Sequence, residues 1–326
     1  MMKVSVIIPI YKVELFIERC VVSLMEQTLD DVEYIFVDDA SPDGSVNILR
    51  EVVERYSLRK DCVKIINHSE NKGLPAARNT GLAEATGEYI FHCDSDDFVE
   101  LDMLESLYNK AKECDADVVW CDYYITFDKK RRIIAQPQFE TPQDAVRGML
   151  RGKMKYNVWN KLVKRLLYVD NKITFPEGKS MGEDLTMIMA FLHAKKCAYV
   201  NKPLYNYVQN PNQMTAIYNE EKLESLKYNC NRISQYIENK FGDADYRNEY
   251  SALKQLMKWP FLLDGKYSSY KRWHKWFPES NAFIWQTKGV NTRIKIIEWC
   301  ASKHLWPIIW IHYIVVIKWF YGIMYR

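Results

Sequence analysis

The sequence lacks the short motifs that mark several common classes of nucleotide and metal enzyme. No G-x-G-x-x-G pattern follows the first run of β-branched residues, where Pro9, Ile10 and Tyr11 stand instead, so a dinucleotide cofactor is not expected. No G-x-x-x-x-G-K-[ST] loop occurs, which argues against a P-loop nucleotide hydrolase. The six histidines are dispersed, without H-x₃-H or H-E-x-x-H spacing, which argues against a zinc site.

Signals for disulfides and secretion are also missing. The eight cysteines include no C-x-x-C pair, and several lie in apolar runs, where a thiol packs as a small hydrophobic group. This distribution fits a reducing compartment better than a disulfide framework. The N-terminal MMKVSVIIPIY is too short to span a bilayer and no small-residue cleavage site follows it. We therefore expect a first strand and a cytoplasmic location.

The composition predicts a packed globular chain with an uneven charge distribution. The 326 residues are 48% hydrophobic and 27% charged, enough for one large domain with an appendage or for two domains. The formal net charge is +3, but the stretch from Lys254 to Arg326 has 12 Lys or Arg against 3 Asp or Glu, a balance of +9. Such a basic tail predicts an anionic partner, either membrane lipid or nucleic acid. Its high apolar content argues against nucleic acid.

Strand and helix patterns alternate over the first 126 residues. A near-continuous β-branched run predicts a strand at residues 3–10, and further apolar runs predict strands at 32–39, 62–68 and 88–93. Helices are predicted at 13–27, 45–56 and 75–85. This alternation predicts an α/β fold with a Rossmann-like, mostly parallel sheet flanked by helices. Ligands of such sheets bind beyond the carboxyl ends of the strands, so Asp38–Asp39 and Asp94–Asp97 are expected on one rim.

The pattern changes along the rest of the chain. Residues 182–194 form an amphipathic helical pattern, and two short strand patterns follow. After about residue 219 the chain reads as helical, basic and aromatic. We expect a ligand-binding and catalytic domain over residues 1–215 and a helical C-terminal region over residues 216–326.

The acidic segment FHCDSDDF has the features of a divalent cation site. Asp94 and Asp96, separated by the small Ser95, can face one ion because alternate residues of an extended segment share a face. Mg²⁺ and Mn²⁺ prefer carboxylate oxygens and can bridge a diphosphate to the protein. The alternative is a capping turn before a helix near Leu101, but the position on the sheet's ligand-binding rim favours a metal.

Three further groups have both a functional and a structural explanation. Asp39 can accept a hydrogen bond from a nucleotide. The segment VDDASPDGS also suits a turn followed by a helix cap, and this structural explanation is favoured when the motif is taken alone. Arg78, near a helix N-terminus, can bind phosphate or form an ion pair within the protein. Glu183 and Asp184 can provide a general base. Acidic residues also suit the start of a helix, and this structural role alone is enough to explain the pair when it is considered by itself.

Taken in order, these motifs resemble the family 2 glycosyltransferases of the GT-A fold. The segments are VSVIIPIYKVELFIERCVVSLMEQTLDDVEYIFVDDASPDGS, NKGLPAARNTGL, GEYIFHCDSDD and GEDL, and they cover about the first two thirds of the chain. VWNKLVKR and KPLYNYVQNPNQMT further resemble bacterial members that build capsule or lipopolysaccharide glycans.

The resemblance implies inverting transfer of a hexosyl or N-acetylhexosaminyl group from a nucleotide-diphospho-sugar, expected to be UDP-linked, to a growing glycan or lipid-linked acceptor. It implies that Pro9 and Tyr11 line the nucleotide pocket and that Asp39 binds the base. The donor-binding set also includes Arg78, Asp94 and Ser95, while Asp96, with Asp94, would hold Mn²⁺ or Mg²⁺. Asp184 would be the catalytic base, ahead of Glu183. No downstream histidine is identified to complete the metal shell.

Two other functions are alternatives. A sugar-nucleotide nucleotidyltransferase would need a Gly-rich basic loop after the first strand, which Pro9-Ile10-Tyr11 does not provide. A non-catalytic nucleotide-sugar-binding protein would have no need of both Asp96 and the Glu183–Asp184 pair.

The segment LWPIIWIHYIVVIKWFYGIMY at residues 305–325 predicts membrane contact. A helix of 19 residues from Pro307 would be about 28 Å long, which is borderline for spanning. Lys318 is costly at bilayer depth, whereas the Trp and Tyr residues suit a headgroup zone. We expect a segment lying on the inner face of the plasma membrane, with a core helix as the alternative.

Overall fold

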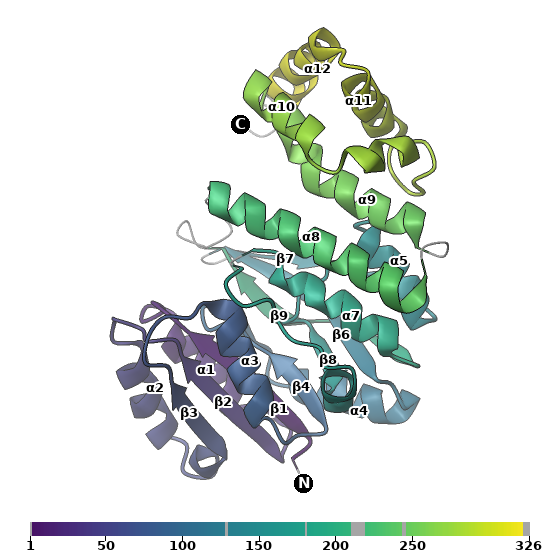
Figure 1. Ribbon diagram of the computed structural model, residues 1–326. Coiled ribbons are helices and arrows are strands. Elements are labelled where there is room, and N and C mark those ends of the chain that lie inside the picture. The colour runs from purple at the N-terminus through teal and green to yellow at the C-terminus, as the bar shows by residue number, and fades with distance from the viewer. Residues whose placement is uncertain (1, 128–129, 180, 210–218, 243–245, 322–326) are drawn as a thin grey trace. The chain divides into compact units, whose positions relative to one another are not determined.

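The computed structural model describes residues 2–127, 130–179, 181–209, 219–242 and 246–321 (Figure 1). The chain forms two compact units, one of Met1–Val146 with Lys155–Ser225 and one of Arg147–Met154 with Leu226–Arg326. The domain boundary expected at residue 215 lies outside the described residues.

The first unit contains a mixed sheet, nine-stranded within the described residues, in the order β3-β2-β1-β4-β8-β6-β9-β5, with β7 paired to β6. The strands are β1 (Val4–Ile10), β2 (Val32–Asp38), β3 (Val63–Asn67), β4 (Tyr89–His92), β5 (Phe98–Val99), β6 (Val118–Phe127), β7 (Lys130–Ile134), β8 (Lys161–Lys164) and β9 (Cys197–Val208). The first four pair in parallel, and β8 is antiparallel to both β4 and β6. The expected α/β, GT-A-like fold is confirmed.

Helices flank this sheet and cover its apolar strands. They are α1 (Ile17–Met25), α2 (Ser45–Glu54), α3 (Leu74–Glu84), α4 (Met103–Cys114), α6 (Arg165–Asp170) and α7 (Thr186–His193). Helix α5 (Pro142–Leu150) contains residues of both units. Every residue of β1 is buried, as its continuous apolar run predicts. The helix expected to begin near Pro75 is α3, with the proline in its first turn.

One close contact fixes α3 against the sheet. A Cβ atom on Gly81 would lie 2.3 Å from Cγ2 of Ile7 in β1, far inside van der Waals contact. Glycine at this position therefore lets α3 approach β1 closely. The N-terminal half of α3 contains Arg78, which lines the cavity described below. Figure 1 shows α3 against the sheet beside β1.

The second unit is helical, which confirms the expected helical C-terminal region. Its helices include α9 (Arg247–Lys258), α10 (Tyr267–Lys275), α11 (Thr292–Ser302) and α12 (Trp306–His312), after α8 (Glu220–Phe241). A π-helical stretch, Tyr313–Tyr321, continues from α12. The hydrophobic core of the second unit consists of Leu262, Tyr270, Trp273, Ile297, Cys300, Ala301 and Ile309.

The apolar tail is buried on one side only. Ile309 and His312 are 1% and 7% exposed. The more exposed apolar residues of this segment are Ile308, Trp310, Ile311, Val315 and Trp319, which are 42–63% exposed. Within the described ranges, no helix combines the length and apolar character needed to cross a bilayer.

Candidate functional site

A cavity of about 1200 Å³ opens in the first unit, and all of its lining residues belong to that unit. The structure brings together there all nine residues singled out in the sequence, namely Pro9, Tyr11, Asp39, Arg78, Asp94, Ser95, Asp96, Glu183 and Asp184. The strand register explains why these residues lie close together. Ile10 pairs with Asp38 and Ile7 pairs with His92, so β1, β2 and β4 all end at one edge of the sheet.

Asp39, directly after β2, is hydrogen-bonded to the loop that precedes α3. Its Oδ1 accepts hydrogen bonds from the backbone N–H of Lys72 at 2.8 Å and pairs with Nδ1 of His68 at 2.7 Å. Its Oδ2 accepts from the N–H of Gly73, also at 2.8 Å, and the side chain is 4% exposed. Gly73 has φ +88°, which favours glycine. Asp39 thus fixes the turn into α3, and its proposed contact with a base remains a prediction.

His68 was not singled out from the sequence. It directly follows β3, and its Nε2 contacts Oγ1 of Thr80 in α3 at 2.9 Å. The imidazole therefore links Asp39 at the end of β2 to the helix that carries Arg78. Its place at the end of the strand predicted at residues 62–68 was the available signal.

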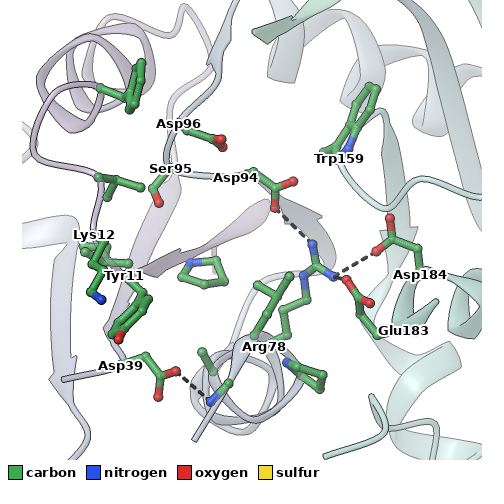
Figure 2. A pocket seen from close by; sticks show the side chains of 18 of the residues that line it. Tyr11, Lys12, Asp39, Arg78, Asp94, Ser95, Asp96, Trp159, Glu183 and Asp184 are labelled. Carbon is green, nitrogen blue, oxygen red and sulfur yellow. Dashed lines mark hydrogen bonds and ion pairs between the residues drawn. The ribbon is translucent and has the colours of Figure 1, made fainter. Parts of the chain in front are cut away.

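Arg78 is the central side chain of the cavity (Figure 2). Its Nη1 donates to Oδ1 of Asp184 at 2.8 Å and to Oε1 of Glu183 at 3.3 Å, and its Nη2 donates to Oδ1 of Asp94 at 3.0 Å. The guanidinium is 1% exposed. The sequence left two roles open for Arg78, phosphate binding and an ion pair within the protein. The structure shows that the ion pair is present.

The charge of Arg78 is fixed by these acids. Burial by itself lowers the pKa of the guanidinium, but the negative charges of Asp184, Asp94 and Glu183 outweigh it and raise the pKa. Arg78 thus stays protonated and offsets part of the repulsion among the carboxylates. It joins the acidic segment after β4 to the acidic pair before α7.

The acidic segment after β4 divides into two parts. Asp97 is 1% exposed and accepts hydrogen bonds from the Tyr205 hydroxyl at 2.8 Å and the Val208 N–H at 2.7 Å, so it anchors β9. Asp94 and Asp96 line the cavity instead. Burial and the nearby charge of Asp94 raise the pKa of Asp96 to about 6.

The oxygens of Asp94 and Asp96 fit the requirements of a hard divalent cation. Mg²⁺ and Mn²⁺ sites need only one or two protein carboxylates when substrate phosphates complete the shell. In the described part of the chain, no group of three or more His, Cys, Asp or Glu side chains is placed to hold a metal alone.

Glu183 and Asp184 stand at the start of a 3₁₀ turn, Glu183–Leu185, that leads into α7. Gly182, at φ +79°, turns the chain into the cavity. Burial and the Asp184 charge raise the pKa of Glu183 to about 8, and burial also raises the pKa of Asp184, against the opposing effect of Arg78. The Asp184 side chain is 23% exposed and that of Glu183 11%, so Asp184 is the more accessible of the two.

Comparison with known proteins identifies relatives of this chain. The sequence model of Glycosyl transferase family 2 matches residues 5–178. "Putative glycosyltransferase EpsH" of Bacillus subtilis is 30% identical over 273 residues, 78% of this chain and 77% of the relative. "Uncharacterized glycosyltransferase EpsJ" of the same organism is 35% identical over 223 residues, 66% of this chain and 63% of the relative's length.

Among solved structures, S. aureus TarS 1-349 has a TM-score of 0.71 at 20% identity and covers 96% of this chain and 91% of that chain. Its complex with UDP-GlcNAc has a TM-score of 0.66 at 19% identity, with the same coverage. At this level of identity the likeness shows the fold.

Proposed function

Because the chain belongs to glycosyl transferase family 2, we propose that it transfers a hexosyl or N-acetylhexosaminyl group from a nucleotide-diphospho-sugar to an acceptor hydroxyl, with inversion at the anomeric carbon. One observation carries the proposal. Arg78 ties Asp94, the proposed cation ligand, and the base candidates Glu183 and Asp184 into one cavity.

The donor is proposed to be UDP-linked. TarS, a protein of the same fold, has been crystallised with UDP-GlcNAc and with UDP, which supports a nucleotide-sugar donor. Pro9, Tyr11 and Asp39 line the end of the cavity proposed for the nucleotide. Lys12 and Tyr11 lie beside one another there (Figure 2).

Asp96, with Asp94 and Ser95 in a D-x-D arrangement, is proposed to hold Mn²⁺ or Mg²⁺ between the donor phosphates and the protein. Such a cation would neutralise charge that develops on the leaving diphosphate. Arg78 orients the carboxylate of Asp94, and Arg19 donates to the backbone oxygen of Asp96 at 3.3 Å, which holds the chain at that residue.

Asp184 is proposed to take the proton from the acceptor hydroxyl. The acceptor oxygen forms the new bond to the anomeric carbon as the bond to the diphosphate breaks, and the proton passes to the carboxylate. Inversion requires the base and the diphosphate on opposite faces of the sugar. Asp184 and Asp96 lie on different sides of the cavity (Figure 2), which suits this geometry.

Asp96→Ala is expected to remove metal-dependent donor binding, because the main oxygen ligand of the cation is lost. Calorimetric titration of UDP-sugars with and without Mn²⁺, after a donor screen by nucleoside diphosphate release, measures the effect. Glu113→Ala, at an exposed acid of α4, is the control. An unchanged metal dependence in Asp96→Ala would contradict this assignment.

The acceptor is proposed to be a growing or lipid-linked glycan of the capsule or lipopolysaccharide type, reached from the cytoplasmic leaflet of the membrane. The exposed apolar residues of α12 and Tyr313–Tyr321 support membrane contact, as do the exposed cations Arg293, Lys303 and Lys318. The opposite side of α12, at Ile309, is packed in the second unit's core, so this helix would lie along the lipid surface.

The double variant Ile311→Ser, Trp319→Ser is expected to reduce binding to vesicles containing phosphatidylglycerol by roughly tenfold or more, because each large apolar side chain contributes about 1.5–3 kcal/mol when fully buried. Cosedimentation measures the bound fraction. Leu58→Ser is the control, since Leu58 is 95% exposed in the first unit. Equal loss in both proteins, or no binding by the wild type, would refute membrane contact by this segment.

A further inference from the structure

Two sequence motifs have no role in the transfer proposed above, and they meet at one pair of aromatic rings. Trp159 comes from VWNKLVKR and Tyr205 from KPLYNYVQNPNQMT. The two rings stack with centroids 4.5 Å apart and an interplanar angle of 18°. Trp159 lines the cavity (Figure 2), whereas Tyr205 is 0% exposed and is not part of the lining. Tyr205 therefore meets no ligand, and its hydroxyl is directed at the protein.

The Tyr205 hydroxyl joins the two ends of the acidic segment Asp94–Asp97. It accepts a hydrogen bond from the backbone N–H of Asp94 at 3.2 Å and donates to Oδ2 of Asp97 at 2.8 Å. The other oxygen of Asp97 accepts from the N–H of Val208 at 2.7 Å. A phenol can donate one hydrogen bond and accept others, so one buried hydroxyl satisfies both contacts.

The chain that follows these acids runs along β9. The N–H of Asp97 donates to the backbone oxygen of Asp94 at 3.1 Å and closes a turn that contains Ser95 and Asp96. Strand β5 then pairs antiparallel with β9, with Val99 opposite Tyr205. The turn that carries Asp96 therefore has both of its ends attached to β9.

The partner of Tyr205 distinguishes it from a tyrosine that serves folding alone. Buried tyrosine hydroxyls usually find a hydrogen-bond partner of some kind. Here the partner is the backbone of Asp94, whose carboxylate is held separately by Arg78 at 3.0 Å. Arg78 thus fixes the side chain of Asp94, and Tyr205 fixes its main chain. Removing a group that orients a metal ligand typically lowers metal affinity by about 10–100-fold.

We propose that Tyr205 is a positioning residue for a divalent cation site at Asp94 and Asp96. Its hydroxyl sets the conformation of the turn from Asp94 to Asp97, and the stacked ring of Trp159 holds the phenol in place. The two carboxylates are thereby oriented before a cation binds, which reduces the entropy that binding must overcome. This inference rests on the cation site of the proposed function and adds to it a residue outside the cavity.

Tyr205→Phe in the full chain is expected to bind Mn²⁺ roughly tenfold or more weakly than the wild type in the presence of UDP. Electron paramagnetic resonance of free Mn²⁺ measures the affinity. UDP binding in EDTA, measured by calorimetry, should be unchanged, because this variant leaves Pro9, Tyr11 and Asp39 intact. A tyrosine that served folding alone would lower the melting temperature and leave the Mn²⁺ affinity of the folded protein as it was.

Tyr199→Phe is the matched control. Tyr199 lies on the same strand, and its hydroxyl likewise donates to an aspartate, Oδ1 of Asp122, at 2.7 Å. Neither residue lines the cavity, so this variant should keep the wild-type affinity for Mn²⁺. An equal loss in both variants would overturn the inference, because the effect would then belong to any hydroxyl removed from β9.

A second comparison covers the case in which Tyr205→Phe does not fold. That variant leaves the buried carboxylate of Asp97 without its hydroxyl partner, which is costly. The double variant Tyr205→Phe, Asp97→Asn removes this charge as well. It should bind Mn²⁺ at least roughly tenfold more weakly than Asp97→Asn alone, since only the double variant lacks the hydroxyl at the Asp94 N–H. Equal affinities in these two proteins would overturn the inference.

The same titrations separate this inference from the proposed function. If the wild type binds Mn²⁺ with UDP and Tyr205→Phe does so equally well, the positioning role fails and the cation site stands. If the wild type binds no Mn²⁺ in the presence of UDP, the cation site of the proposed function fails, and the role of Tyr205 fails with it.

Discussion

Asp184→Asn is expected to bind the nucleotide-sugar donor as the wild type does and to transfer sugar roughly 10²–10⁴-fold more slowly, the usual contribution of a general base. The amide cannot take the acceptor's proton. Its oxygen can still accept the hydrogen bond from Arg78 that Oδ1 of Asp184 accepts at 2.8 Å, so the cavity should keep its shape. Turnover with saturating donor, beside the donor dissociation constant from calorimetry, measures the two effects independently.

Glu183→Gln is the matched control for this experiment. Glu183 is the more buried of the pair and its raised pKa favours the protonated form, so the substitution should have the smaller effect on turnover. Normal transfer by Asp184→Asn together with loss in Glu183→Gln would move the base to Glu183. Loss of donor binding in Asp184→Asn would show that the pair serves the donor site instead.

Arg78→Met is expected to lower the free energy of unfolding by about 3–5 kcal/mol, the range for removing one partner of a buried ion pair. The guanidinium is 1% exposed and pairs with Asp94, Glu183 and Asp184, which would be left without their shared cation. Arg78→Lys should recover only part of the loss, because an ammonium cannot reproduce the planar fork that contacts both acidic segments. Urea denaturation measures each variant.

The loss of stability in Arg78→Met should depend on pH in a definite direction. Without Arg78, the buried carboxyl groups have pKa values raised in the folded state, so the folded protein binds protons more readily than the unfolded chain. The stability deficit should therefore be larger at about pH 8 than at about pH 5. Arg55→Met removes an exposed pair with Glu18, whose side chains are 56% and 57% exposed, and should cost only about 0–1 kcal/mol at either pH. Equal deficits in the two variants would contradict the role assigned to Arg78.

Local patterns in the sequence predicted much of the first unit. The apolar runs and Pro75 located β1 to β4 and α3. The burial of β1, β2 and β4, and the preference of proline for a first helical turn, leave a local signature. The expectation that the acidic segments share one rim also followed from strand and helix alternation alone. The strand register confirms that β1, β2 and β4 end together.

The partners of individual side chains could not be predicted, because they come from distant parts of the chain. Arg78 pairs with Asp184, 106 residues away, and the sequence around either residue does not indicate this partner. Asp97 looks equivalent to Asp96 in the sequence, but Tyr205 in β9 draws it inward. The four-residue strand β8 was missed for a similar reason, since its place between β4 and β6 depends on non-local pairing.

The absence of a side chain at Gly81 has a consequence beyond packing. Arg78 precedes Gly81 by three residues and so lies on the same side of α3, one turn nearer the cavity. The free space between this helix and Ile7 is smaller than one methyl group. Even alanine at position 81 would push the helix outward and carry the guanidinium away from its acids, so a residue that meets no ligand limits which sequences can keep this chemistry.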